Sequence, residues 1–73
     1  QIEDWDRSVD AWQAALDLIP GSRSDRLHLA RAFVGAGRLE DGLRQYVALL
    51  ALRPGDQDLR GEYEALKLQL SEQ

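Results

Sequence analysis

Apolar side chains recur along this chain at steps of three and four residues, which is the spacing of one face of an α-helix. Asp4, just before the first such stretch, has the short carboxylate that commonly caps a helix N-terminus. The pattern predicts a first helix over about residues 4–19. Its apolar positions are Trp5, Val9, Trp12, Leu16 and Ile19.

Three further stretches have the same helical spacing. The second begins at Ser22, which Asp25 follows at the spacing of a capping box, and ends at the glycine-rich turn 35–37. The third runs over residues 39–52, and the fourth starts after Asp56, another favourable N-cap. The apolar faces of these helices contain Leu27, Leu29, Ala30, Ala32, Phe33, Val34, Leu39, Leu43, Tyr46, Leu49, Leu50, Leu52, Leu59, Tyr63, Leu66 and Leu70.

The two prolines mark the ends of the first and third helices. Pro20 and Pro54 are each followed by glycine. A Pro-Gly pair ends a helix because proline lacks the N–H donor and glycine permits the turn. No stretch has the alternating apolar and polar positions of a half-buried β-strand. The sequence therefore predicts an all-α protein with four helices.

The chain repeats itself with a period of 34 residues, which is the separation of Pro20 from Pro54. A shift by this period also matches other positions that are apolar, small or helix-ending in both copies. The matched pairs are Trp5 with Leu39, Ser8 with Gly42, Val9 with Leu43, Trp12 with Tyr46, Ala14 with Ala48, Leu16 with Leu50, Leu18 with Leu52 and Gly21 with Gly55. So many matches at one shift indicate a repeating unit of two helices.

A two-helix unit of this length resembles the tetratricopeptide repeat, although other helical-pair repeats share the period. The matching residues fall in the family's Leu-Gly-x-x-Tyr stretch, its turn glycine, and its Ala-x-x-x-Phe and Pro positions. They are Leu29, Ala30, Phe33, Gly37, Gly42, Tyr46 and Pro54. Arg26 stands where the family has tryptophan, and Gly42 where it has alanine. The resemblance implies antiparallel helix-turn-helix repeats in a right-handed α-solenoid.

The repeat register divides residues 1–73, a single domain, into three parts. In this register residues 1–22 are the second helix of an incomplete repeat, and residues 23–56 are a complete repeat. Residues 57–73 are either a capping helix or the first helix of a following repeat. The acidic, amphipathic character of this last part suits the end of a solenoid, which has to face solvent. We therefore expect the chain to be a piece of a larger solenoid.

The resemblance also implies a function, a non-catalytic scaffold for protein–protein interaction. The family commonly binds peptide segments on its concave face, so the expected partner is a protein or peptide. Within that face, Arg31 has two roles that can coexist: it pairs internally with Asp58 or Glu62, and a carboxylate of the partner can displace that internal one. The family register places on this face Ser24, Leu27, Arg31, Val34, Gly35, Asp58, Gly61, Ala65, Leu68 and Gln69.

Two alternatives to this function stay open. One is a structural spacer or self-assembly segment, and the register leaves the first helix without a preceding helix. We therefore expect self-association through its uncovered apolar side, beside Ile2. The other is a scaffold in bacterial envelope or exopolysaccharide export machinery. A bacterial source fits the basic residues, which are arginines except for Lys67. The absence of cysteine fits a cytoplasmic or a periplasmic location.

Charge and hydropathy argue against two classes of partner. The chain has 13 acidic and 9 basic residues and a net charge of −4, so it repels phosphate on average. We therefore expect no binding to nucleic acid. The longest apolar stretch, residues 46–52, is far shorter than the ~20 residues that span a bilayer. Direct membrane insertion is not expected either.

No catalytic, cofactor or metal site is predicted. His28 is the only histidine, and it lies in no ligand pattern. The acidic residues Glu3, Asp4 and Asp6 lack the glycine and the spaced oxygen ligands of an EF-hand loop. Carboxylates at this position stabilise the positive end of a helix, which accounts for them without a metal.

Two further features have a structural and a functional explanation. Trp5 and Trp12 lie two helical turns apart, as in a platform for sugar stacking, but they match core positions of the next repeat. We assign them to the core. The glycine-rich turn 35–37 has no strand before it and no Lys-Ser/Thr after it, so it is not a phosphate-binding loop.

Overall fold

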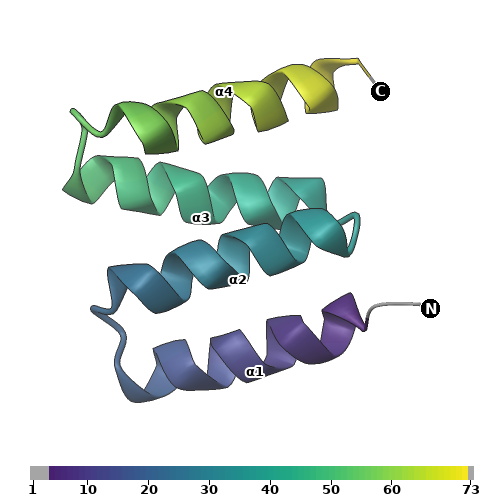
Figure 1. Cartoon of the computed structure of the whole chain (residues 1–73), viewed down its shortest axis with the longest axis vertical. Helices are drawn as coiled ribbons and strands as arrows, with labels where there is room; N and C mark the ends of the chain where they lie inside the picture. Colours follow the sequence, from purple (N-terminus) through teal and green to yellow (C-terminus); the bar gives the residue numbers. More distant parts are fainter. Residues whose placement is uncertain (1–3, 73) are drawn as a thin grey trace.

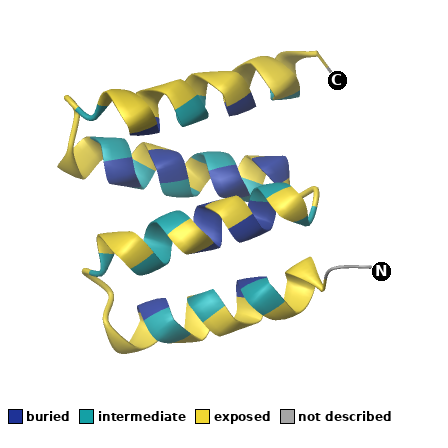
Figure 2. Cartoon of the chain, viewed as in Figure 1, coloured by how far each residue is buried: buried dark blue, intermediate teal, exposed yellow. Residues whose placement is uncertain are grey.

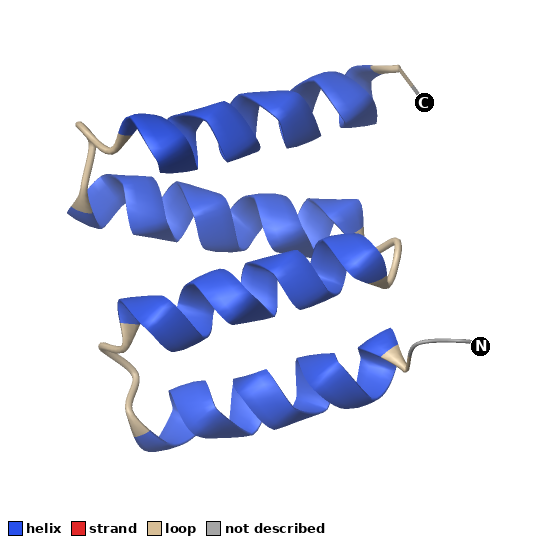
Figure 3. Cartoon of the chain, viewed as in Figure 1, coloured by secondary structure: helices blue, strands red, loops and turns tan. Residues whose placement is uncertain are grey.

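The computed structural model describes residues 4–72, which form four α-helices joined by short loops (Figure 1). The helices are α1 (Trp5–Leu18), α2 (Arg23–Gly35), α3 (Leu39–Leu52) and α4 (Gln57–Ser71). Residues 4–72 contain no strand (Figure 3). The prediction of an all-α protein with four helices is therefore confirmed, and each helix lies close to its predicted range.

The side chains predicted to cap three of the helices do so. Asp4, Ser22 and Asp56 each accept a hydrogen bond from the backbone N–H three residues later, at 3.0, 3.3 and 3.1 Å. These bonds satisfy donors that a helix N-terminus otherwise leaves unpaired. α3 lacks such a cap and instead follows a tight turn at Gly37, whose φ of 80° is a conformation that favours glycine.

The helix boundaries recur with the period that separates Pro20 from Pro54. α3 begins and ends one such period after α1, and α4 begins one period after α2 (5 to 39, 18 to 52, 23 to 57). The loops correspond as well. Ile19 has φ −131° and ψ 80°, and Arg53 has φ −136° and ψ 75°. The N–H of Ser22 donates to the Ile19 carbonyl at 3.0 Å, and that of Asp56 to the Arg53 carbonyl at 3.1 Å. The period seen in the sequence is thus also a period of the backbone.

Each helix packs antiparallel to the one that follows it (Figure 1). Among residues 4–72, close backbone contacts between helices join only α1 with α2, α2 with α3 and α3 with α4. The molecule measures 30 × 28 × 17 Å. The helices therefore pack in chain order, and the molecule is thinner in one direction than in the other two.

The core consists of two apolar clusters that share α2 (Figure 2). One lies between α1 and α2 and contains Val9, Leu16, Leu29, Ala32 and Phe33. The other joins α2, α3 and α4 and contains Ala30, Leu39, Tyr46, Leu49, Leu59 and Leu66. Since α2 contributes to both clusters from different faces, it links the two halves of the structure.

Three residues predicted on the apolar faces are more exposed than expected. Leu52 is 63% exposed because its direction, at 100° per residue, lies about 140° from that of Leu39 on α3. Ile19 is 62% exposed because it follows the end of α1, where the backbone leaves the helical conformation. Trp5 is 37% exposed, since it lies at the first position of α1, with its indole ring against Gly35.

Candidate functional site

Ser24 and Leu27, two of the predicted concave-face residues on α2, line a groove of about 280 Å³. The groove lies where α2 meets the end of α3 and the start of α4. Leu27 is half-buried and forms part of an apolar floor, whereas Ser24 is exposed. The complete lining is Arg23, Ser24, Leu27, Leu49, Arg53, Asp56 and Leu59.

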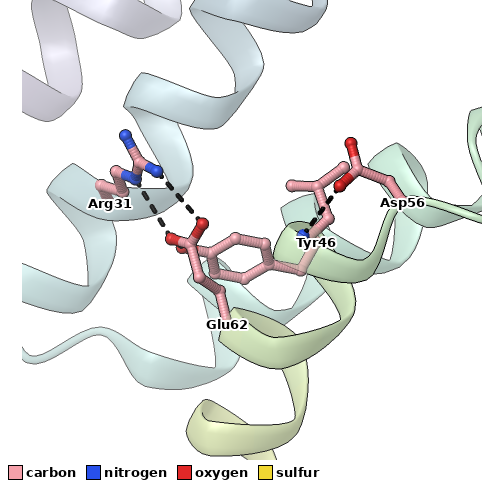
Figure 4. Close-up of polar contacts among 5 residues, drawn as sticks. Arg31, Tyr46, Asp56 and Glu62 are labelled. Carbon is pink, nitrogen blue, oxygen red and sulfur yellow. Dashed lines mark hydrogen bonds and ion pairs between the residues drawn. The ribbon is translucent and has the colours of Figure 1, made fainter.

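Arg31, one turn further along α2, forms a two-pronged ion pair with Glu62 of α4 (Figure 4). Its Nε and Nη2 atoms each donate to a different carboxylate oxygen at 3.1 Å. The Tyr46 hydroxyl of α3 donates to the same carboxylate at 3.0 Å. The internal pair expected for Arg31 is therefore formed, and Glu62 rather than Asp58 is its partner. The three residues connect α2, α3 and α4 by polar contacts.

These contacts shift the pKa values of all three groups. The hydrogen bond from Arg31 lowers the pKa of Glu62, and partial burial of the carboxylate opposes this effect. The same hydrogen bond raises the pKa of Arg31. Burial, followed by the hydrogen bond to Glu62, raises the pKa of Tyr46 to about 12. At neutral pH the network therefore consists of a guanidinium, a carboxylate and a neutral phenol that donates.

We expect Glu62→Gln to lower the free energy of unfolding at neutral pH by no more than about 1 kcal/mol, because the side chains of Arg31 and Glu62 are 52% and 34% exposed. The folded-state pKa of Glu62 lies below its unfolded value of 4.5. Its stabilisation is therefore present above that value and disappears as pH falls through the folded-state pKa.

Urea unfolding of wild type and variant from neutral pH to about pH 3 tests this expectation. The two free energies should converge at the acidic end. Glu64→Gln is the matched control on the same helix, since the closest approach of Glu64 to Arg60 is 4.0 Å. A gap between wild type and Glu62→Gln that stays constant down to the lowest pH would contradict the role assigned to the ion pair.

Val34 and Gly35, the last two residues predicted on the α2 face, have packing roles. Val34 is half-buried and packs against the cluster that joins α2, α3 and α4. Its side chain also faces Gly42 of α3, where an added Cβ would lie 3.0 Å from Val34 Cγ2. The indole ring of Trp5 lies where a Cβ on Gly35 would be. Gly35 is exposed and Val34 partly so, and both stay on the predicted α2 face with Ser24, Leu27 and Arg31.

The predicted residues of α4 are exposed, and the groove includes none of them. These residues are Asp58, Gly61, Ala65, Leu68 and Gln69. Leu68 lines an open hollow of about 580 Å³ on α4 alone, together with Arg60, Tyr63, Glu64, Lys67 and Ser71. Contact between the α2 and α4 sets is made instead by Glu62, one residue from Gly61. The predicted face is therefore not a single cavity.

The two tryptophan side chains of α1 and the single histidine contact other residues of the chain. The Trp12 and His28 rings are stacked, with centroids 4.4 Å apart and an angle of 21° between the planes. Because Trp12 packs on His28 and Trp5 on Gly35, each indole has its own partner on α2. Within residues 4–72, no group of three His, Cys, Asp or Glu side chains is placed to hold a metal ion.

Sequence reasoning missed the two arginines that line the groove, Arg23 and Arg53. Arg23 begins α2, and Arg53 directly follows α3. A signal for both was present in the sequence. Arg23 has no acidic residue three or four positions further along α2, and Arg53 has none three or four positions back along α3. Asp56, three positions after Arg53, caps α4 instead.

Two expectations concern surfaces: that no helix spans a membrane, and that an apolar side of the first helix is uncovered. No described helix is long and apolar enough to cross a membrane. On and beside α1 the exposed large apolar residues are Trp5 at one end and Leu18 and Ile19 at the other. They form no continuous strip along the helix. Ile2, which was expected to extend that surface, and Glu3 lie outside the described residues.

Comparison of the chain with protein-family models, curated proteins and solved structures gives no match.

Proposed function

We propose that this chain is a non-catalytic protein-interaction scaffold, built as a right-handed α-solenoid of helical pairs that resemble the tetratricopeptide repeat. The observation that carries the proposal is the backbone period. The starts of the helices, the ends of α1 and α3, and the loop conformation at Ile19 and Arg53 recur after the same interval along the chain. A unit that repeats in this way buries its apolar face by stacking on its neighbours.

The packing between helices supports the same proposal. Close backbone contacts join consecutive helices along residues 4–72, and side chains of α2 also contact α4, as expected of helical pairs that stack on one another. Gly42, at the small-residue position of the family pattern, is buried where α3 crosses α2. A small residue at that point lets the two backbones approach closely. Such stacking leaves one side of the α2 and α4 row available to an extended partner.

A peptide partner would meet Ser24, Leu27 and Arg31 on α2. The guanidinium of Arg31 is half-exposed although it is paired with Glu62. A carboxylate of the partner can therefore share or replace Glu62, and the apolar Leu27 lies one turn from Arg31 on α2. This arrangement of an arginine next to an apolar residue is frequent at the centre of interfaces.

Selection of a phage-displayed random peptide library on the immobilised chain tests the proposal. We expect a consensus to be enriched, and synthetic peptides with that consensus to bind in solution by calorimetry. Arg31→Ala should weaken binding, whereas Arg44→Ala, an exposed arginine on α3, should leave it unchanged.

Selection without a consensus would overturn the scaffold proposal. Sedimentation then decides whether the alternative of a self-assembly segment holds. A dimer or larger species at high concentration would support that alternative. A monomer that binds no peptide would contradict both.

A further inference from the structure

Two arginines differ from all other basic side chains in the described part of the chain. Six arginines have a side-chain or backbone acceptor: Arg7, Arg26, Arg31, Arg38, Arg44 and Arg60. Lys67 lies over the ring of Tyr63. Within residues 4–72, Arg23 and Arg53 have no hydrogen bond, ion pair or aromatic ring as a partner. A guanidinium has five donors and retains its charge, so each of these two remains available to an external anion.

Both of these arginines line the same groove, which has an apolar floor. Leu49 is 2% exposed and Leu59 is 8% exposed, so their side chains are held firmly by the core. Leu27 completes the floor. The volume of about 280 Å³ is slightly below the range of about 300–1,000 Å³ for small-molecule sites. It suits one apolar side chain with the backbone around it.

The charges around the groove favour an acidic ligand over a basic one. Asp56 is the one acidic residue in its lining, and its carboxylate already accepts the N–H of Leu59 as a helix cap. The positive ends of α2 and α4 lie at the groove, since Arg23 and Leu59 belong to their first turns, and they outnumber the one negative helix end there, that of α3. The net charge of −4 is spread over the rest of the surface and is screened beyond about 8–10 Å at physiological salt.

We propose that this groove binds an acidic–apolar peptide motif, in which one leucine-sized side chain lies between carboxylate side chains. The apolar side chain fills the floor formed by Leu27, Leu49 and Leu59, and the carboxylates pair with Arg23 and Arg53. This assignment rests on the proposed scaffold function and adds to it the chemistry of the partner. It differs from the Arg31 surface, where the guanidinium already has Glu62.

A synthetic peptide with blocked ends, Gly-Glu-Asp-Leu-Asp-Glu-Gly, is the probe. Its binding to the full chain is measured by fluorescence anisotropy, and the contact site by changes in amide NMR signals. We expect the changes to centre on Leu27, Leu49 and Leu59. The double variant Arg23→Gln/Arg53→Gln should weaken binding about tenfold or more, because both charge-assisted contacts are lost.

The matched control is Arg7→Gln/Arg44→Gln, which removes the same charge from exposed positions outside the groove. Its affinity for the probe should change less than about twofold, because exposed charges at a distance are screened. The groove variant should fold normally, since neither of its arginines contacts a partner within the described chain. Replacing the leucine of the probe by alanine should also weaken binding.

Equal loss of affinity in both double variants, NMR changes outside the groove, or no binding of the probe would each overturn the assignment. The library selection separates this failure from that of the scaffold proposal. If selection enriches peptides without the acidic–apolar pattern, the scaffold proposal stands and the groove assignment falls. If selection enriches no consensus and the probe does not bind, both fall.

Discussion

Leu49→Asp is expected to unfold the chain. Leu49 is 2% exposed and lies in the cluster that joins α2, α3 and α4. A carboxylate buried there without a partner costs several kcal/mol. A single core in a chain of this size rarely supplies more than about 3–5 kcal/mol, so the loss is comparable with the whole stability. A thermal melt followed by circular dichroism should show no cooperative transition.

Leu52→Asp is the matched control for this prediction. It places the same charge on the same helix, but Leu52 is 63% exposed. A surface substitution of this kind changes the free energy of unfolding by no more than about 0.5 kcal/mol. If Leu49→Asp melts like Leu52→Asp, the packing of α3 described above is wrong.

The parts of the fold that depend on local chemistry could be predicted from the sequence. The caps at Asp4, Ser22 and Asp56 depend on one side chain and an amide three residues later, so adjacent residues determine them. The α4 face could be predicted for a similar reason. Leu59 and Leu66 are buried and two turns apart, as its spacing indicated. Periodicity fails where a helix ends, as at Ile19, or where a residue is off the stripe, as at Leu52.

The candidate site could be predicted only in part, because it depends on contacts between helices. The ion pair between Arg31 and Glu62 was one of the two roles expected for Arg31, and the repeat register had brought the two helices together. The stacking of Trp12 on His28 requires the rotation of α1 relative to α2, which spacing along the chain does not specify. To predict the groove, the relative placement of three helices has to be known, since its lining comes from α2, the end of α3 and the start of α4.

Gly42 makes the close approach of α3 to α2 possible. An added Cβ would lie 3.2 Å from the Ala30 carbonyl oxygen and 3.0 Å from Val34 Cγ2. The valine methyl can rotate away, but the carbonyl belongs to the backbone of α2 and cannot move without shifting that helix. A side chain larger than alanine at this position therefore has no free space to occupy. Replacing glycine also has a stabilising effect that opposes the steric one, because most residues favour a helix over glycine by up to about 1 kcal/mol.

Gly42→Leu should therefore destabilise the chain by about 1–3 kcal/mol, since overpacking between α2 and α3 outweighs the gain in helix propensity. Gly61→Leu is the control, because Gly61 lies within α4, is exposed, and has nothing within 4 Å of an added Cβ. That variant should gain about 0.5–1 kcal/mol from propensity alone. Urea unfolding of both variants measures the difference, and the propensity gain common to the two cancels in it. Equal stabilisation by both would show that α2 and α3 do not approach closely at Gly42, and would remove one of the observations that support stacked helical pairs.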